Sequence, residues 1–176
     1  MVAFSSHQRS RTGTGVPLGD RWVSIRPIER TDAPGLSDFY DGLSPESRRR
    51  RFLGCARQSG DELARRFTEP EDEGFVAILA ERGPNDGAIV GHATLQPDGT
   101  GGAEVALAVT DDLQGRGIGH LLMDAVVTGA RTAGLRRLNA ILFADNAAMR
   151  RLLRGSAGSV VADAIESGVE EIVLAV

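Results

Sequence analysis

Residues 103–127 read Ala-Glu-Val-Ala-Leu-Ala-Val-Thr-Asp-Asp-Leu-Gln-Gly-Arg-Gly-Ile-Gly-His-Leu-Leu-Met-Asp-Ala-Val-Val. The first seven residues are apolar except for Glu104, which is typical of a buried strand. Three glycines follow at every second position: Gly115, Gly117 and Gly119. After them, apolar residues recur at spacings of three and four, as on the buried face of a helix. The stretch therefore predicts a strand, a glycine loop and a helix.

A glycine loop that opens a helix is suited to binding an anion. The first N–H groups of a helix have no partner inside the helix, and the helix dipole places partial positive charge beside them. Glycine has no Cβ, so a phosphate can come close to these donors. The loop therefore predicts a phosphate-binding site.

Three phosphate-binding motifs compete for this loop. A P-loop ends in Gly-Lys-Ser/Thr, and the chain contains no lysine, so this motif is excluded. The dinucleotide motif Gly-x-Gly-x-x-Gly fits poorly, because His120 stands where its third glycine would fall. The pattern Gln/Arg-x-x-Gly-x-Gly/Ala fits residues 114–119 at every position.

With this loop, the apolar strand before it, the helix after it and a downstream asparagine, the sequence resembles the GNAT acetyltransferase superfamily. The resemblance implies that acetyl-CoA is the co-substrate and that the loop cradles its pyrophosphate. It also implies that one strand edge pairs with the pantetheine arm. His120 and Arg116 could add charge near phosphate or simply face solvent, and Asn146 could contact the cofactor or only cap a helix. The residues that it assigns to acetyl-CoA are Leu107, Ala108, Val109, Gln114, Gly115, Arg116, Gly117, Ile118, Gly119, His120 and Asn146.

Glu104 is the candidate general base. An acid within an apolar strand is costly unless it has a partner or a use. Such a carboxylate can have a raised pKa, which suits it to take a proton from an amine, directly or through water. The Ala-Glu-x-Ala setting also resembles the base-bearing strand of bacterial protein lysine acetyltransferases. The alternatives are a glutamate that faces solvent and His92, on the neighbouring predicted strand, as a weaker base.

The sequence departs from the family at the general acid. Many GNAT enzymes carry a tyrosine in the helix after the late asparagine, where it protonates the departing thiolate. Here that helix contains no tyrosine, and the chain's single tyrosine is Tyr40. We therefore assign no general acid, because a thiol with the pKa of coenzyme A can leave as thiolate or take its proton from water.

The acceptor is expected to be a primary amine, with a protein lysine favoured. The stretch Leu43-Ser44-Pro45-Glu46-Ser47-Arg48 resembles the first-helix region of bacterial protein lysine acetyltransferases. A small amine is the nearest alternative acceptor. A non-catalytic acyl-CoA-binding module that senses the cofactor or regulates a partner is the alternative from another class, and the missing tyrosine supports it.

Composition narrows these possibilities. The chain has 176 residues, 41% of them apolar, which suits one globular domain. Its net charge of −4 argues against a general nucleic-acid binder. Its single cysteine, Cys55, is read as a packing residue, and this cysteine usage suits a reducing cytoplasm. Neither metal-ligand spacing nor a membrane-spanning apolar stretch occurs in the sequence, and we expect a monomer or a homodimer.

The order of the remaining signals predicts an α/β (α+β) protein with the GNAT fold. Residues 1–20 are expected to be a flexible tail, and residues 21–176 a single domain. We expect one mixed, mostly antiparallel sheet that is flanked by helices. Strands are predicted at 22–28, 74–81, 88–96, 103–109, 137–143, 160–163 and 169–176. Helices are predicted to begin near Thr31, Ser44, Gly60, the glycine loop and Asn146.

Four adjacent arginines, Arg48 to Arg51, lie within the second predicted helix. At 100° per residue they would point in all directions around the helix. They are interpreted either as a solvated and partly paired face or as a contact for an acidic partner or for the nucleotide phosphate of CoA.

Overall fold

The computed structural model describes residues 16–18, 21–54, 58–70, 75–83 and 87–176. Its strands are β1 (Val16–Leu18), β2 (Arg21–Pro27), β3 (Val76–Arg82), β4 (Ile89–Pro97), β5 (Gly102–Val109), β6 (Arg137–Phe143), β7 (Ser159–Glu166) and β8 (Val169–Ala175). Its helices are α1 (Ala33–Gly42), α2 (Pro45–Arg51), α3 (Gly60–Thr68), α4 (Ile118–Thr132) and α5 (Ala147–Arg154). Two short 3₁₀ turns, η1 (Arg30–Asp32) and η2 (Asp111–Leu113), precede α1 and follow β5.

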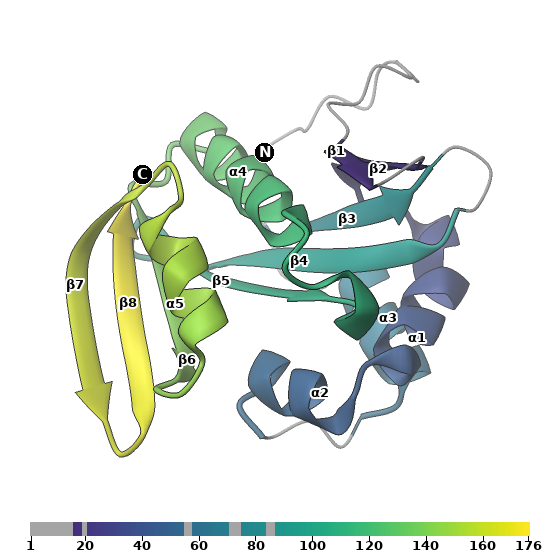
Figure 1. Cartoon of the computed structure of the whole chain (residues 1–176). Coiled ribbons are helices and arrows are strands. Elements are labelled where there is room, and N and C mark those ends of the chain that lie inside the picture. The colour runs from purple at the N-terminus through teal and green to yellow at the C-terminus, as the bar shows by residue number, and fades with distance from the viewer. Residues whose placement is uncertain (1–15, 19–20, 55–57, 71–74, 84–86) are drawn as a thin grey trace.

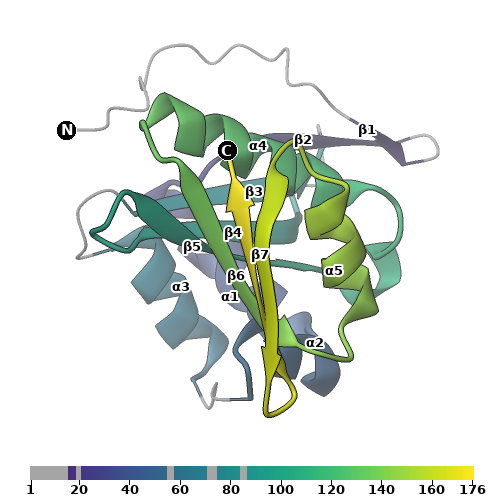
Figure 2. The ribbon, with the colours of Figure 1, turned by 90° about the vertical axis from the view of Figure 1, so that its left-hand side faces the viewer.

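The strands form one sheet in the order β1-β2-β3-β4-β5-β6-β8-β7. Neighbouring strands are antiparallel except for β5 and β6, which are parallel. The mixed, mostly antiparallel sheet that the sequence predicts is therefore confirmed. β6, β8 and β7 run steeply across the direction of β3, β4 and β5, as the right-handed twist of a large sheet requires (Figures 1 and 2).

The predicted elements agree closely with the observed ones, and β1 is the main difference. This short strand lies within the segment expected to be a flexible tail, and it pairs antiparallel with β2. β7 is also longer than its predicted range of 160–163. Cys55 lies outside the described residues.

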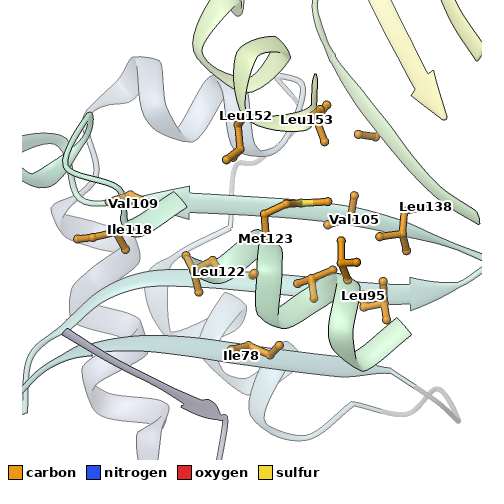
Figure 3. Packing of buried hydrophobic residues seen from close by; sticks show 14 of the residues in the cluster. Ile78, Leu95, Val105, Val109, Ile118, Leu122, Met123, Leu138, Leu152 and Leu153 are labelled. Carbon is orange, nitrogen blue, oxygen red and sulfur yellow. The ribbon is translucent and has the colours of Figure 1, made fainter. Parts of the chain in front are cut away.

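Helix α4 packs against the middle of the sheet and positions its own N-terminus there. Its inward side chains are almost fully buried and meet residues from β3, β4 and β5 (Figure 3). Leu122 is completely buried, and truncating such a side chain costs about 2–5 kcal/mol of stability. Gly91 of β4 lets α4 lie close to the sheet, since a Cβ at this position would lie 2.9 Å from Leu122 Cδ1.

The opposite face of the sheet is covered by α1 and α3. Their apolar residues form a second cluster with Leu79 of β3 and Ile89 of β4. Helix α2 follows α1 and lies below the end of β5, on the side of the sheet away from α4 (Figure 1). Ser44 begins α2 as the sequence predicts, because its hydroxyl accepts a hydrogen bond from Ser47 N–H at 3.2 Å.

Candidate functional site

The parallel strands β5 and β6 stay paired over only three residues each. Gly102, Ala103 and Glu104 pair with residues 137–139, and no pairing continues beyond them. β4 remains paired with β5 as far as Val109. The two parallel strands therefore separate in a V, and the edge of β5 that faces β6 is left without a strand partner from residue 105 onward.

The backbone direction of β5 shows which groups face this opening. Thr110 N–H donates to Val90 O on β4 at 3.0 Å. Because backbone groups point alternately to the two sides along a strand, Leu107 and Val109 direct theirs toward β6. Val109 O accepts a hydrogen bond from the side-chain amide of Gln114 at 3.2 Å, but no strand pairs with this edge among the described residues. An extended ligand can therefore take the place of a strand there.

The glycine loop forms the next wall of the site. Gly115 and Gly117 have φ values of 73° and 91°, a region that favours glycine, and a Cβ at either would meet no atom within 4 Å. The N–H groups of residues 115–119 donate no backbone hydrogen bond within the part of the chain that the structure describes. These donors, at the N-terminus of the 15-residue helix α4, form a site for a phosphate group.

A cavity of about 470 Å³ joins the open strand edge to the glycine loop. It brings together most of the residues predicted for the cofactor: Leu107, Ala108, Val109, Gln114, Gly115, Gly117, Gly119, His120 and Asn146. Arg116 and Ile118 do not line it. Arg116 is exposed, and the side chain of Ile118 is buried in the core against Gly91, so only their backbone N–H groups remain available to a ligand.

Asn146 caps a helix, which is one of the two roles that its position suggested. Its Oδ1 accepts a hydrogen bond from Met149 N–H at 3.1 Å, so it caps α5. It also lines the cavity. The cap therefore fixes α5 beside the cavity wall.

A further part of the wall was not assigned to the cofactor from the sequence, although its two α2 arginines belong to the run that was considered as a contact for the nucleotide phosphate of CoA. It comprises Ser47, Arg50 and Arg51 of α2, Ile141 of β6, and Met149 and Arg151 of α5. The α2 residues are spaced at three and four positions, which places them on one face of the helix. That spacing was visible in the sequence, but nothing local indicated that α2 lies against β5.

The arginines of α2 leave the helix in different directions, as predicted. Arg48 donates to Tyr40 O at 2.6 Å, and Arg49 lies 4.1 Å above the ring of Phe143. Arg50 forms an ion pair with Glu46 at 2.6 Å. The interpretation as a partly paired face is thus correct for these three. Arg51 lines the cavity, as Arg50 also does, and its Nη2 donates to Thr94 Oγ1 at 3.0 Å.

A polar cluster ties α2 to the segment that follows β5. Asp111 accepts hydrogen bonds from Ser44 N–H at 2.9 Å and from the hydroxyls of Ser44 and Ser47 at 2.7 Å. Burial acts to raise the pKa of Asp111, but these hydrogen bonds outweigh it and the pKa is lowered. Gln114 adds a link, since its amide donates to Ser47 Oγ at 3.1 Å and to Val109 O at 3.2 Å.

Glu104 lies where the V begins. It forms the last pair between β5 and β6, opposite Asn139. Its side chain is exposed and does not line the cavity. It shares a face of β5 with Ala106 and Ala108, which do line the cavity. A carboxylate here is open to solvent.

The structure does not support His92 as a base. The ring is fully buried, and its Nδ1 forms a hydrogen bond of 2.7 Å with the Tyr40 hydroxyl. Burial, with a smaller contribution from the charge of Arg51, lowers the pKa of His92 well below its usual range. The same contact holds Tyr40, which is also fully buried, away from the cavity lining. Neither side chain can exchange a proton with a ligand in the cavity.

No three His, Cys, Asp or Glu side chains gather into a group that could hold a metal ion within the described residues. None of the helices described in the structure has the length and apolar character needed to cross a membrane.

Comparison with known proteins identifies this arrangement. The family model described as acetyltransferase (GNAT) family matches residues 36–157, which include the open strand edge, the glycine loop and α5. The chain belongs to the GNAT acetyltransferase family. The resemblance noted in the sequence is thereby confirmed, together with the expected fold.

Two curated acetyltransferases resemble this GNAT chain. Acetyltransferase Pat of Mycolicibacterium smegmatis is 32% identical over 145 residues, which cover 80% of this chain and 43% of that protein. The chain therefore spans less than half the length of that relative. Acetyltransferase PA5475 of Pseudomonas aeruginosa is 31% identical over 147 residues, which cover 76% of this chain and 78% of that protein.

A solved structure agrees with the GNAT assignment over nearly the full length. The GNAT domain of S. lividans PAT superposes with a TM-score of 0.79 at 25% identity, covering 97% of this chain and all of that domain.

Proposed function

We propose that this domain transfers the acetyl group of acetyl-CoA to a primary amine, and that the amine is the side chain of a protein lysine. The observation that carries the proposal is the separation of β5 and β6 beside the free amides of the glycine loop. A pantetheine arm is a chain of amides that ends in a pyrophosphate. It therefore matches an unpaired strand edge that leads to a phosphate site.

The residues fit acetyl-CoA in two places. The N–H groups of residues 115–119 would bind the pyrophosphate, and the backbone groups of Leu107 and Val109 would bind the amides of the pantetheine arm. The glycines at 115 and 117 leave the space that a phosphate needs. His120 and Arg151, at the cavity wall, lie where cationic or donor side chains can contact further phosphate oxygens.

Glu104 would act as the general base. Bound acetyl-CoA supplies an activated thioester carbonyl. Glu104 accepts a proton from the acceptor ammonium, directly or through one water, and thereby frees the nitrogen lone pair. The nitrogen bonds to the carbonyl carbon, the carbon–sulfur bond breaks, and sulfur leaves with the electron pair. The nitrogen loses its second proton to water, and water protonates the thiolate, because the chain's single tyrosine, Tyr40, is buried against His92 outside the cavity lining.

The protein-lysine acceptor rests on two resemblances, the Ala-Glu-x-Ala setting of Glu104 and the stretch 43–48. The position of that stretch supports the proposal, since Ser47 at its end lines the cavity. The exposure of Glu104 supports it further, because a lysine on a folded protein needs an open approach to the base.

The test is to incubate the purified chain with acetyl-CoA and a mixed cell lysate and to follow acetylation by mass spectrometry. The chain contains no lysine, so acetyl-lysine must come from acceptors. We expect Glu104→Gln to lose about 100-fold or more in turnover while it keeps its affinity for CoA. The matched control is Glu171→Gln, which changes another exposed strand glutamate outside the cavity wall.

Each other result points elsewhere. Release of free CoA without labelling of proteins would favour a small amine as acceptor. Binding of CoA with no turnover in the wild type would contradict the proposal and favour a module that senses the cofactor. An active Glu104→Gln variant would remove Glu104 from the mechanism.

A further inference from the structure

Arg51 is a cation in the cavity wall without a carboxylate partner among the described residues. Its Nη2 donates to Thr94 Oγ1 at 3.0 Å, and its Nε is buried without a hydrogen bond to any described residue. The neighbouring Arg49 and Arg50 both form ion pairs with Glu46. Placing a partly buried charge without an acid is costly, unless an anionic ligand completes the site.

The contacts of Arg51 indicate which part of a ligand bound along β5 its guanidinium would meet. The Thr94 hydroxyl that it contacts donates in turn to Ala106 O at 3.3 Å. Ala106 lies between Glu104, the proposed base, and Leu107, the first residue proposed for the pantetheine arm. The guanidinium therefore lies against the section of β5 where the acyl group would be placed.

The surroundings hold the guanidinium in place. Its Cζ lies 5.1 Å from the ring centroid of Phe52 and 5.6 Å from that of Phe67, within the range of cation–π contacts. These rings and Thr94 restrict the side chain before any ligand binds. A preorganised arginine can bind a carboxylate with less loss of side-chain freedom than a mobile one.

We propose that Arg51 binds the far end of the acyl group, and that this domain accepts short acyl-CoA thioesters that end in a carboxylate, such as succinyl-CoA, as well as acetyl-CoA. This inference rests on the proposed function, because it uses the same cavity and the same base. In this transfer the amine nitrogen bonds to the thioester carbon, the carbon–sulfur bond breaks, and sulfur leaves with the electron pair. Glu104 takes the first ammonium proton, and water carries the second nitrogen proton to the thiolate. The terminal carboxylate stays unreacted beside Arg51.

The experiment compares the binding of succinyl-CoA and butyryl-CoA by calorimetry, which needs no acceptor. The two acyl chains have the same carbon count and differ in the terminal carboxylate. We expect the wild type to bind succinyl-CoA about tenfold more tightly, as a charge-assisted hydrogen bond provides. The affinity ratio should fall to about one in Arg51→Gln, and Arg51→Lys should retain part of it.

The matched control is Arg49→Gln, which removes the same charge from the same helix outside the cavity wall. It should keep the wild-type ratio. A wild-type ratio near one, or an unchanged ratio in Arg51→Gln, would overturn the inference. So would an equal loss of affinity for both thioesters in that variant, since Arg51 would then act on a part that they share.

Binding of CoA itself separates this inference from the proposed function. If the wild type fails to bind CoA, the cavity is not a CoA site and both proposals fail. If the wild type binds CoA and Gly117→Trp does not, the cavity is supported as the CoA site. An affinity ratio of succinyl-CoA to butyryl-CoA near one then rejects only the role of Arg51.

Discussion

Glu104 and Asn139 form the last pair of the parallel ladder between β5 and β6, and the two strands separate beyond them. This single pair sets the geometry of the site. It holds the proposed base at the narrow end of the V, whereas the glycine loop lies at the far end of β5, after Val109. The length of β5 from Glu104 to Val109 therefore sets the distance between the proposed base and the glycine loop.

The conformation of Gly117 gives a first prediction. We expect Gly117→Ala to destabilise the fold by about 1 kcal/mol, because its φ of 91° is unfavourable for a residue with a Cβ. It should also weaken the binding of CoA, measured by calorimetry. Gly99→Ala is the matched control, since its φ is 74°, its Cβ would also meet no atom within 4 Å, and it lies outside the cavity wall. A similar loss of CoA affinity in both variants would argue against the loop as the phosphate site.

The burial of His92 predicts a dependence of stability on pH. The folded state keeps this ring neutral, since its pKa is lowered well below the usual range. The unfolded state binds a proton below a pKa of about 6.5, so acid favours unfolding by about 1.4 kcal/mol at about pH 5.5. Urea unfolding at neutral and acidic pH should show this loss in the wild type. This loss should be absent from the His92→Gln variant, so the difference in unfolding free energy between wild type and variant should change by about 1.4 kcal/mol between neutral pH and about pH 5.5. Parallel dependences on pH in the two proteins would contradict the prediction.

The hydrogen bonds of Asp111 predict that it anchors α2. Asp111→Ala removes the acceptor for Ser44 N–H and for two serine hydroxyls. We expect amide hydrogen exchange in residues 44–51 to accelerate by about tenfold or more. Helix α3 is the internal control, because it carries its own capping box between Ser59 and Glu62. Equal acceleration in α3 would indicate general destabilisation instead.

The buried ion pair of Arg150 and Glu170 should contribute much more to thermal stability than the exposed ion pair of Arg154 and Asp163. Glu170 is only 1% exposed, and Arg150 Nε donates to its carboxylate at 2.9 Å. Arg150→Ala would leave that charge buried alone and should lower the Tm by about 10 °C. Arg154→Ala breaks an exposed pair with Asp163 and should lower the Tm by no more than about 2 °C. Similar Tm values for the two variants in a thermal scan would contradict this.

Much of the fold and part of the site could be predicted because the signals are local. The limits of β6 and α3 follow directly from periodicity and capping, and the glycine loop follows from its spacing. β1 could not be predicted, because three residues are too few for a period and its neighbours are polar and glycine-rich. The burial of His92 could not be predicted either, because the sequence of a strand does not reveal which helices cover each of its faces.

The sequence by itself determined the family, the strand, glycine loop and helix at its centre, and the residues that line one side of the cavity. These features depend on hydrogen-bond geometry and side-chain period within a few residues of each other. Only the tertiary structure decided that β5 and β6 separate after Glu104, that α2 lies below the opening, and that Arg51 is the one of the four adjacent arginines that lines the cavity without a carboxylate partner among the described residues. Those facts depend on contacts between segments far apart in the chain, and such contacts leave no pattern in the order of residues.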